Sequence, residues 1–302
     1  MAEGTLLPRT PRTSARGIAR RKHIRVTVKN VFLWAVIVVA TAWCFFPFYW
    51  AIITSFKPRS VILTRPSLIP WLQYTPTTFN WEDEFTRGPE IVHALGNSVL
   101  IAVGAAIIAV TLGTLAGYGL ARYRFYGWKN RDMTVWFLSQ RFLPPIVTVI
   151  PFAIIIKTIG LIDSPLALIL ANATFTLPFA VLTLRDVFRD LPKELEESAW
   201  VDGASHFQAF WWIALPLAAP AVAAAAVICF AFAWNEFLFA LVLTYQNAIP
   251  VTVVIAGLEH TQGIQFAAVA TRLLLAILPP ALLALTAQRY IVRGLTFGAV
   301  KG

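Results

Sequence analysis

The sequence predicts an all-α, polytopic membrane protein with six transmembrane helices, and three observations lead to this fold class. First, 58% of the 302 residues are hydrophobic and 13% are charged, against roughly 45–50% and 25% in soluble domains. Second, six apolar stretches are long enough to cross a hydrocarbon core of about 30 Å. Third, lysine and arginine gather in alternate connections between these stretches. Too few charged residues remain to cover a soluble fold of this size, so the apolar excess is expected to face lipid.

Each apolar stretch is assigned to one span. The first is uncharged over 23 residues, which reach about 34 Å as a helix. The second exceeds one crossing, so its end over 117–121 is expected to protrude. The third contains Arg141 and three prolines, which predicts a kinked helix that faces protein or water there. The predicted spans are 31–53, 91–121, 133–156, 164–184, 215–243 and 266–288.

The distribution of basic residues predicts the orientation. Eighteen lysines and arginines lie in one alternate set of segments and five in the other. Because basic residues are retained in the cytoplasm, both termini are expected there. Residues 1–30 are interpreted as a disordered basic cytoplasmic arm and residues 31–302 as the transmembrane domain. A cleaved signal is disfavoured, since an apolar core of 23 residues exceeds the usual about 7–15.

Composition and motifs also exclude several functions. The net charge of +10 is spread between apolar runs and is not interleaved with aromatics on one face, so no nucleic-acid partner is expected. The histidines and cysteines lack metal-ligand spacing, so no metal site is predicted. No nucleophile elbow, zinc-protease motif or phosphate-binding loop occurs, so no catalytic residue is assigned and this chain is not expected to hydrolyse nucleotides.

The connection between spans four and five, residues 185–214, is too polar to cross a membrane and too apolar for a bare linker. Pro192 suits the first turn of a short helix, with acidic residues near its positive end. Gly203 permits a tight turn, and residues 204–213 form a second helix. An aromatic stripe at i, i+3, i+4 spacing on that helix is expected to meet a partner surface. The stripe consists of Phe207, Phe210 and Trp211.

The same connection carries a spaced motif. Glu197-Ser198-Ala199 is followed after three residues by Gly203, and after nine more by Ile213-Ala214-Leu215-Pro216. In this motif the chain resembles the membrane subunits of binding-protein-dependent ATP-binding-cassette (ABC) importers of the carbohydrate, maltose-permease-like type. Ser198 replaces the alanine of the family pattern. Further resemblance lies in Asn97-Ser98, residues 121–125, Trp234-Asn235-Glu236-Phe237 and residues 294–302.

The resemblance implies a type I ABC importer permease fold and a set of partners. These are a second homologous permease subunit, two ATPase subunits that use ATP and Mg²⁺, and an extracytoplasmic solute-binding protein, all at a bacterial inner membrane. The implied substrate is a sugar, oligosaccharide or polyol, and no cofactor is expected on this chain. The residues that the resemblance assigns to ATPase coupling are Glu197, Ser198, Ala199, Asp202, Gly203, Ile213, Leu215 and Pro216.

Polar residues at membrane depth are candidates for the substrate pathway, because a mid-span charge costs roughly 2.5–3.5 kcal/mol unless it faces a cavity or partner. Amide, carboxylate and guanidinium groups bind sugar hydroxyls, while aromatic faces cover the ring. The candidates are Gln140, Arg141, Asn172, Thr174, Thr176, Asn235 and Glu236. Arg272 is a weaker candidate, since its side chain could equally extend to the lipid headgroups. A structural alternative stays open, in which Arg141 and Glu236 form a buried ion pair and Asn235 caps an interrupted helix or binds another subunit.

Two other functions remain as alternatives at this stage. A stand-alone secondary carrier or channel would place a charged ion site, such as Arg141 with Glu236, at mid-membrane. A membrane scaffold would need no polar cavity. Uptake that depends on ATP, and not on an ion gradient, separates the importer from both.

Overall fold

The computed structural model describes residues 15–62, 64, 67–86, 89–257, 259–260 and 263–296. For 15–29, 89, 259–260, 263–264 and 289–296 only the backbone is described. The elements are α1 (Ala15–Ser55), α2 (Arg59–Ile62), α3 (Phe79–Thr86), α4 (Pro89–Arg122), α5 (Asn130–Gln140), α6 (Pro145–Thr158), α7 (Pro165–Asp190), α8 (Glu194–Val201), α9 (His206–Ala209), a π-helical turn η1 (Phe210–Ala214), α10 (Leu215–Trp234), α11 (Leu238–Leu243), α12 (Val251–Ala256), the paired strands β1 (Glu259–His260) and β2 (Gly263–Ile264), and α13 (Phe266–Thr296).

The chain divides into two units, residues 1–53 and 54–302, and each is described by itself. In the first unit, α1 begins at Ala15, so the second half of the arm expected to be disordered is helical. Alanine, arginine and lysine are good helix formers, and they extend the apolar span backwards. Residues 1–14 of the predicted arm lie outside the described residues.

Five helices in the described part of the chain are long and apolar enough to cross a membrane. A sixth span is obtained if α5 and α6 are counted as one broken crossing. The chain is therefore an all-α, multi-pass membrane protein. The five long segments are Asn30–Ser55, Glu90–Arg122, Pro165–Asp190, His206–Trp234 and Phe266–Gln288.

The predicted third and fifth spans differ from the structure in the same way, because both are broken. Residues 133–156 form two helices, α5 and α6, with a 94° bend between them and not one kinked helix. The adjacent Pro144 and Pro145 explain the break, since both lack a backbone N–H and neither fits a helix interior, whereas Pro145 suits the first position of α6. The span predicted over 215–243 stops at Trp234, and α11 resumes at Leu238.

The second helix of the predicted hairpin is also not separate. Residues 206–234 run as one helical segment through the π-helical turn η1, so the aromatic residues of the connection continue directly into α10. Likewise, residues 185–190, expected in the connection, are the last turns of α7. The connection is therefore shorter, and more directly joined to the membrane helices, than its composition indicates.

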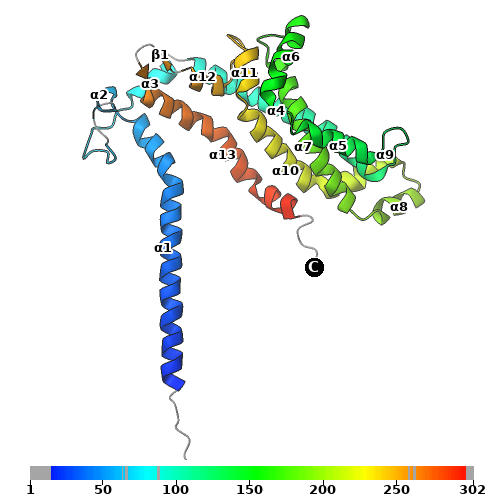
Figure 1. The fold of residues 1–302 in the computed structure, drawn as a ribbon, viewed down its shortest axis with the longest axis horizontal. Coiled ribbons are helices and arrows are strands. Elements are labelled where there is room, and N and C mark those ends of the chain that lie inside the picture. Colours follow the sequence, from blue (N-terminus) through cyan, green and yellow to red (C-terminus); the bar gives the residue numbers. More distant parts are fainter. Residues whose placement is uncertain are drawn as a thin grey trace, which may run out of the picture. The chain divides into compact units, whose positions relative to one another are not determined.

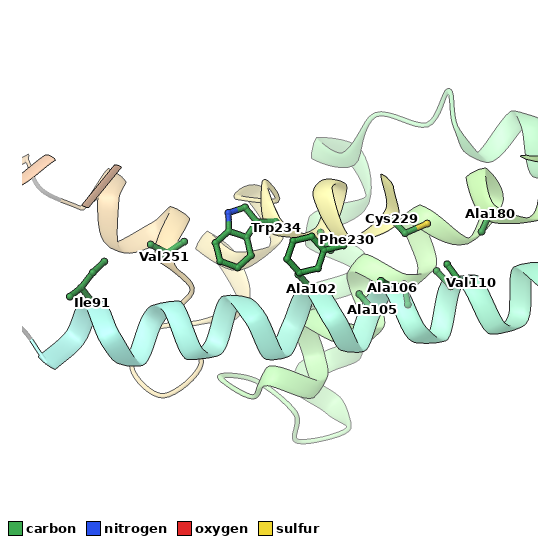
Figure 2. Close-up of a cluster of buried hydrophobic side chains, with 13 residues drawn as sticks. Ile91, Ala102, Ala105, Ala106, Val110, Ala180, Cys229, Phe230, Trp234 and Val251 are labelled. Atoms are coloured by element: carbon green, nitrogen blue, oxygen red, sulfur yellow. The ribbon is translucent and has the colours of Figure 1, made fainter. Parts of the chain in front are cut away.

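The core of the second unit lies between α4, α7 and α10, which pack side by side (Figure 1). Figure 2 shows α4 presenting Ala102, Ala105 and Ala106 to Phe230 and Trp234 of α10. The alanines repeat at helical spacing, so one face of α4 is lined with small side chains. Small residues let membrane helices approach closely, and here they make room for the large aromatic rings of α10.

The closest approach between α4 and α7 is at Gly113. A Cβ atom built on this glycine would lie 2.5 Å from the Cβ of Ala180 and 3.1 Å from its carbonyl carbon. The exposed Gly96, near the start of the same helix, has nothing within 4 Å of that position. The two glycines therefore differ in packing although both are helical.

We expect Gly113→Ala to destabilise the protein by about 1–3 kcal/mol, because the added methyl group overpacks the α4–α7 contact. Gly96→Ala is the matched control, and it should leave stability unchanged or raise it by up to about 1 kcal/mol. Thermal unfolding of both purified variants in detergent measures the difference. Equal unfolding temperatures would contradict the close packing described here.

Candidate functional site

The connection between α7 and α10 forms a helical hairpin at one end of the bundle, near α8 and α9 in Figure 1. Three acidic residues occupy the first turn of α8, where the helix dipole favours negative charge. Pro192 precedes α8 and is not part of its first turn. The hairpin reverses at Gly203, whose φ of +89° suits a residue without a side chain. Ser205 and Gln208 then form a reciprocal capping box at the start of α9.

A buried carboxylate fixes α8 to α4. The Tyr118 hydroxyl donates a hydrogen bond of 2.6 Å to Oε2 of Glu196, and Nε of Arg122 donates one of 2.7 Å to Oε1. The side chains of Arg122 and Glu196 are only 5% and 3% exposed. Nη2 of Arg122 also donates to the Leu191 carbonyl oxygen, at 3.1 Å. Burial at this depth means that the pair cannot separate into water, so α8 is held rigidly against the end of α4.

The aromatic stripe of the hairpin divides between the core and the surface. Phe210 is buried, and its ring centroid lies 4.7 Å from that of Tyr118. Phe207 and Trp211 stack on one another at 6.2 Å and remain exposed. One residue of the stripe therefore holds the hairpin to the bundle, and the other two form an apolar surface beside α8.

The coupling candidates lie on both sides of this turn. Glu197 and Ser198 are exposed on α8, and Ala199 is half-buried. Asp202 caps the end of α8 ahead of Gly203. The later members belong to the helix that enters the membrane, with Ile213 in η1 and Leu215 and Pro216 at the start of α10. The first group thus lies at the turn of the hairpin, and the second lies in the helical segment that continues into α10.

A separate polar cavity of about 240 Å³ lies where the broken helices meet α7. Gln140 and Arg141 come from the break between α5 and α6, Asn172 from α7, and Glu236 from the break after α10. Thr176 of α7 also contributes. The apolar part of the lining is Leu143, Pro145, Phe175, Phe179 and Phe232. Hydrogen-bonding groups and aromatic rings therefore share one space.

Arg141 and Glu236 do not pair with each other among the described side chains. The Arg141 guanidinium lies 5.4 Å from the centroid of the Phe179 ring, a favourable cation–π distance. The Glu236 carboxylate accepts backbone N–H bonds from Phe239 at 2.7 Å and Ala240 at 3.1 Å. It thus satisfies the first free donors of α11, which explains how the chain can be broken at this depth.

Two pathway candidates lie outside the cavity lining. Thr174 is exposed, and its hydroxyl donates back to the Leu170 carbonyl at 2.8 Å. Asn235 is also exposed; it is the C-cap residue of α10, and its amide donates to the Ala231 carbonyl at 2.8 Å. Its contacts therefore agree with the alternative in which Asn235 caps an interrupted helix.

A second buried carboxylate, that of Asp163, also anchors one part of the chain to another, and the sequence did not predict it. Its carboxylate accepts hydrogen bonds from the backbone N–H groups of residues 245–248 at 2.9–3.2 Å. Burial raises the pKa of Asp163, but these backbone donors outweigh it, so the pKa lies below its ordinary value. The same loop is held from α4, since Asn97 donates to the Asn247 carbonyl at 2.9 Å and Ser98 accepts from Val251 N–H at 2.8 Å.

Arg272 forms a partly buried ion pair with Glu84 of α3. Nε of Arg272 donates to Oε1 of Glu84 at 2.6 Å, and Nη1 donates to the Val254 carbonyl at 3.2 Å. Burial raises the pKa of Glu84, and the guanidinium only partly offsets this. Arg272 is therefore bound within the protein and does not line the cavity.

A family model described as "Binding-protein-dependent transport system inner membrane component" matches residues 109–296. This range is most of the chain and includes the hairpin and the cavity. The chain belongs to this family. It is accordingly a transport permease, and the resemblance read from the motif around Gly203 is confirmed.

Named relatives support the assignment. This permease is 38% identical over 274 residues to the trehalose transport system permease protein SugB of Mycobacterium tuberculosis, covering 89% of this chain and 97% of the relative. It is 34% identical to the trehalose/maltose transport system permease protein MalG of Thermococcus litoralis over 86% of this chain and 92% of that one. Identity is 33% to the diacetylchitobiose uptake system permease protein DasC of Streptomyces coelicolor, over 85% and 92%.

Solved structures agree on the fold. A bacterial ABC transporter involved in import of the acidic polysaccharide alginate superposes with a TM-score of 0.73 at 19% identity, covering 93% of this permease and 99% of the other chain. The MetNI methionine ABC transporter gives a TM-score of 0.56 at 16% identity, over 68% and 95%. The predicted importer permease fold is confirmed.

We expect Glu196→Ala to lower the free energy of unfolding by about 3–5 kcal/mol, because it leaves the buried Arg122 without its carboxylate. The adjacent Glu197→Ala is the matched control and should change stability by no more than about 0.5 kcal/mol, since that side chain is exposed. Denaturant unfolding in detergent measures both. The double replacement Arg122→Met with Glu196→Leu should recover most of the lost free energy of unfolding. If Glu196→Ala does not destabilise the protein, the Glu196 carboxylate does not anchor α8.

Proposed function

We propose that this permease is one of two membrane subunits that together enclose the pathway of an ATP-driven importer for a sugar, oligosaccharide or polyol. The names of the relatives support the substrate class, since they transport trehalose, maltose or diacetylchitobiose. The partners are a second permease, two ATPase subunits that bind ATP and Mg²⁺, and a solute-binding protein outside a bacterial inner membrane. This chain itself carries no cofactor and hydrolyses no ATP.

The orientation proposed from the basic residues places both termini and the α8 hairpin in the cytoplasm. The four segments rich in lysine and arginine then lie on the side where ATP is available. The acid-bearing α3 and the loop held by Asp163 lie on the opposite side, where a solute-binding protein would dock.

The anchored hairpin is the observation that carries the proposal. An ATPase that grips the exposed face of α8 moves α4 with it, because Glu196 is locked to Arg122 and Tyr118. The π-helical turn joins the same hairpin directly to α10. Closing and opening of the ATPase would therefore turn two membrane helices together and alternate access to the cavity.

The cavity supports a pathway for polyhydroxylated solutes. Gln140, Asn172 and Glu236 offer donors and acceptors, and Phe175 and Phe232 offer flat apolar faces. Its volume of about 240 Å³ is below the roughly 300–1,000 Å³ usual for small-molecule sites. A second permease subunit would supply the other wall.

Reversal of the charge at Glu197 tests the coupling role. We propose that Glu197 faces a basic rim on the ATPase. We therefore expect Glu197→Lys to reduce co-purification of the ATPase at least about tenfold, because like charges at an interface cost several kcal/mol. ATP-driven uptake of labelled trehalose, maltose or diacetylchitobiose into proteoliposomes should fall in parallel. Asp190→Lys is the control, since it makes the same charge change at an exposed site on α7. Uptake that survives ATP removal but stops with an ionophore would instead indicate a secondary carrier.

Removal of a single amide tests the cavity. We expect Gln140→Ala to raise the KM for uptake about fivefold, the value of one lost hydrogen bond of about 1 kcal/mol. Gln140 is preferred to Glu236 because Glu236 also caps α11. Thr174→Ala on α7 is the control outside the cavity and should leave uptake unchanged. Normal kinetics in the Gln140 variant of an assembled complex would argue against this cavity as the pathway.

A further inference from the structure

A second and larger cavity lies at the other end of α5, where α4 and α7 also end. Its volume is about 690 Å³, and its polar and apolar walls come from the last turn of α4, the following connection, the first turns of α5 and the end of α7. Arg122 of its lining also anchors α8, but the coupling candidates and the substrate-pathway candidates lie outside this cavity.

The charged residues that line this cavity are all basic. Arg122 and Arg185 have carboxylate partners, in Glu196 and Asp186. No ion pair of the described residues involves the other five, and no acidic residue is part of the lining. These five are Arg124, Lys129, Arg131, Arg189 and Lys193. All five are exposed, so water screens their mutual repulsion, but together they give the cavity a positive potential that favours an anion.

An unsatisfied buried donor also points to a ligand. Nη1 of Arg122 is fully buried and has no hydrogen-bond partner among the described residues, although Nε and Nη2 of the same group are both bonded. A buried donor without a partner costs about 1–3 kcal/mol, and more when the group is charged. Arg122 is part of the cavity lining, and a shift of its guanidinium toward an anion there would supply the missing acceptor.

The walls of the cavity are fixed in place by the fold. Asn130 donates to the Leu120 carbonyl at 2.9 Å, and so ties the last turn of α4 to the first residue of α5. Nη1 of Arg185 donates to the Thr134 hydroxyl at 2.7 Å, which holds α7 against α5. The cations are thus presented by a built cavity and not by a mobile tail.

We propose that this cavity binds a phosphate group, and that an anionic phospholipid headgroup is its source. The cavity lies where the apolar helices α4 and α7 end and α5 begins, which is the depth of lipid phosphates if α4 and α7 span the membrane. Tyr126 and Trp128 are exposed on the adjoining connection, and such aromatics are enriched at the membrane interface. Guanidinium groups match phosphate oxygens in geometry as well as charge.

Native mass spectrometry of the full chain, purified with the subunits that accompany it, tests the proposal. Titration with phosphatidylglycerol should produce a lipid-bound mass peak, and excess phosphatidylcholine should not displace this lipid. Arg189→Gln and Lys193→Gln should each weaken this binding about fivefold, the contribution of one basic residue near anionic lipid. The exposed Lys157→Gln, outside the cavity, is the matched control and should bind lipid as the unchanged chain does.

The source of the phosphate is separated by a second arm. Inorganic phosphate and glycerol phosphate, added at millimolar concentration, should not displace the lipid from the unchanged chain. If they displace it there but not from the Arg189 and Lys193 variants, the cavity is a site for soluble phosphate compounds instead. If the Arg189 variant fails to fold, Arg124→Gln takes its place. Equal phosphatidylglycerol binding by the cavity variants and the Lys157 variant, with no binding of soluble phosphate, would overturn the proposal. This outcome is independent of the importer assignment, since it measures no transport.

Discussion

A single carboxylate, that of Glu196, decides how the cytoplasm-facing hairpin proposed here relates to the membrane helices. Removal of both Glu196 and Arg122 from water carries a large desolvation penalty, which their short hydrogen bond and the Tyr118 hydroxyl together offset. Such a network has one favourable geometry, because any rotation of α8 would leave a buried charge unpaired. An exposed pair would allow α8 to swing independently of α4. Rigidity of the hairpin therefore follows from burial and not from the strength of the ion pair as such.

A second constraint comes from the backbone itself. Within a bilayer each free N–H and carbonyl needs a partner, so a helix can break only where protein or a water-filled space supplies one. Both breaks of this chain border the same cavity, and the Glu236 carboxylate caps the second. Polar groups at the two breaks thus border one space, as the proposed pathway for a hydroxyl-rich solute requires.

The sequence contained enough to predict the fold class, the family and the approximate positions of the long helices. Composition and apolar length are properties of whole segments, so they survive errors at single residues. The break between α10 and α11 was not predicted, because Asn235 and Glu236 lie inside an otherwise apolar stretch whose mean hydropathy stays high. The motif around Gly203 can be recognised from its spacing. The sequence does not show that Glu196, and not Glu194 or Glu197, fixes this hairpin to α4.

Glu196 shows why that distinction needs the structure. It stands among three acidic residues in one turn, and nothing in their order says which of them faces Arg122, some 74 positions earlier. Asp163 poses the same difficulty, because its partners are backbone N–H groups more than 80 residues away, which leave no mark in the sequence. By contrast, the alanines of α4 repeat at helical spacing, and their role in close packing could be read directly. Periodic packing is visible in one chain, whereas long-range polar contacts are not.

The two anchors have a joint mechanical consequence. Asn97 and Ser98 hold the loop after α11 near the start of α4, and Arg122 holds α8 at its end. About 38 Å of helix separates these points at 1.5 Å per residue. Between them, α4 is packed through small residues against α7 and α10, so bending it would disrupt close contacts such as that between Gly113 and Ala180. In the proposed importer, a displacement applied at α8 would therefore be transmitted along α4 to the loop at its opposite end.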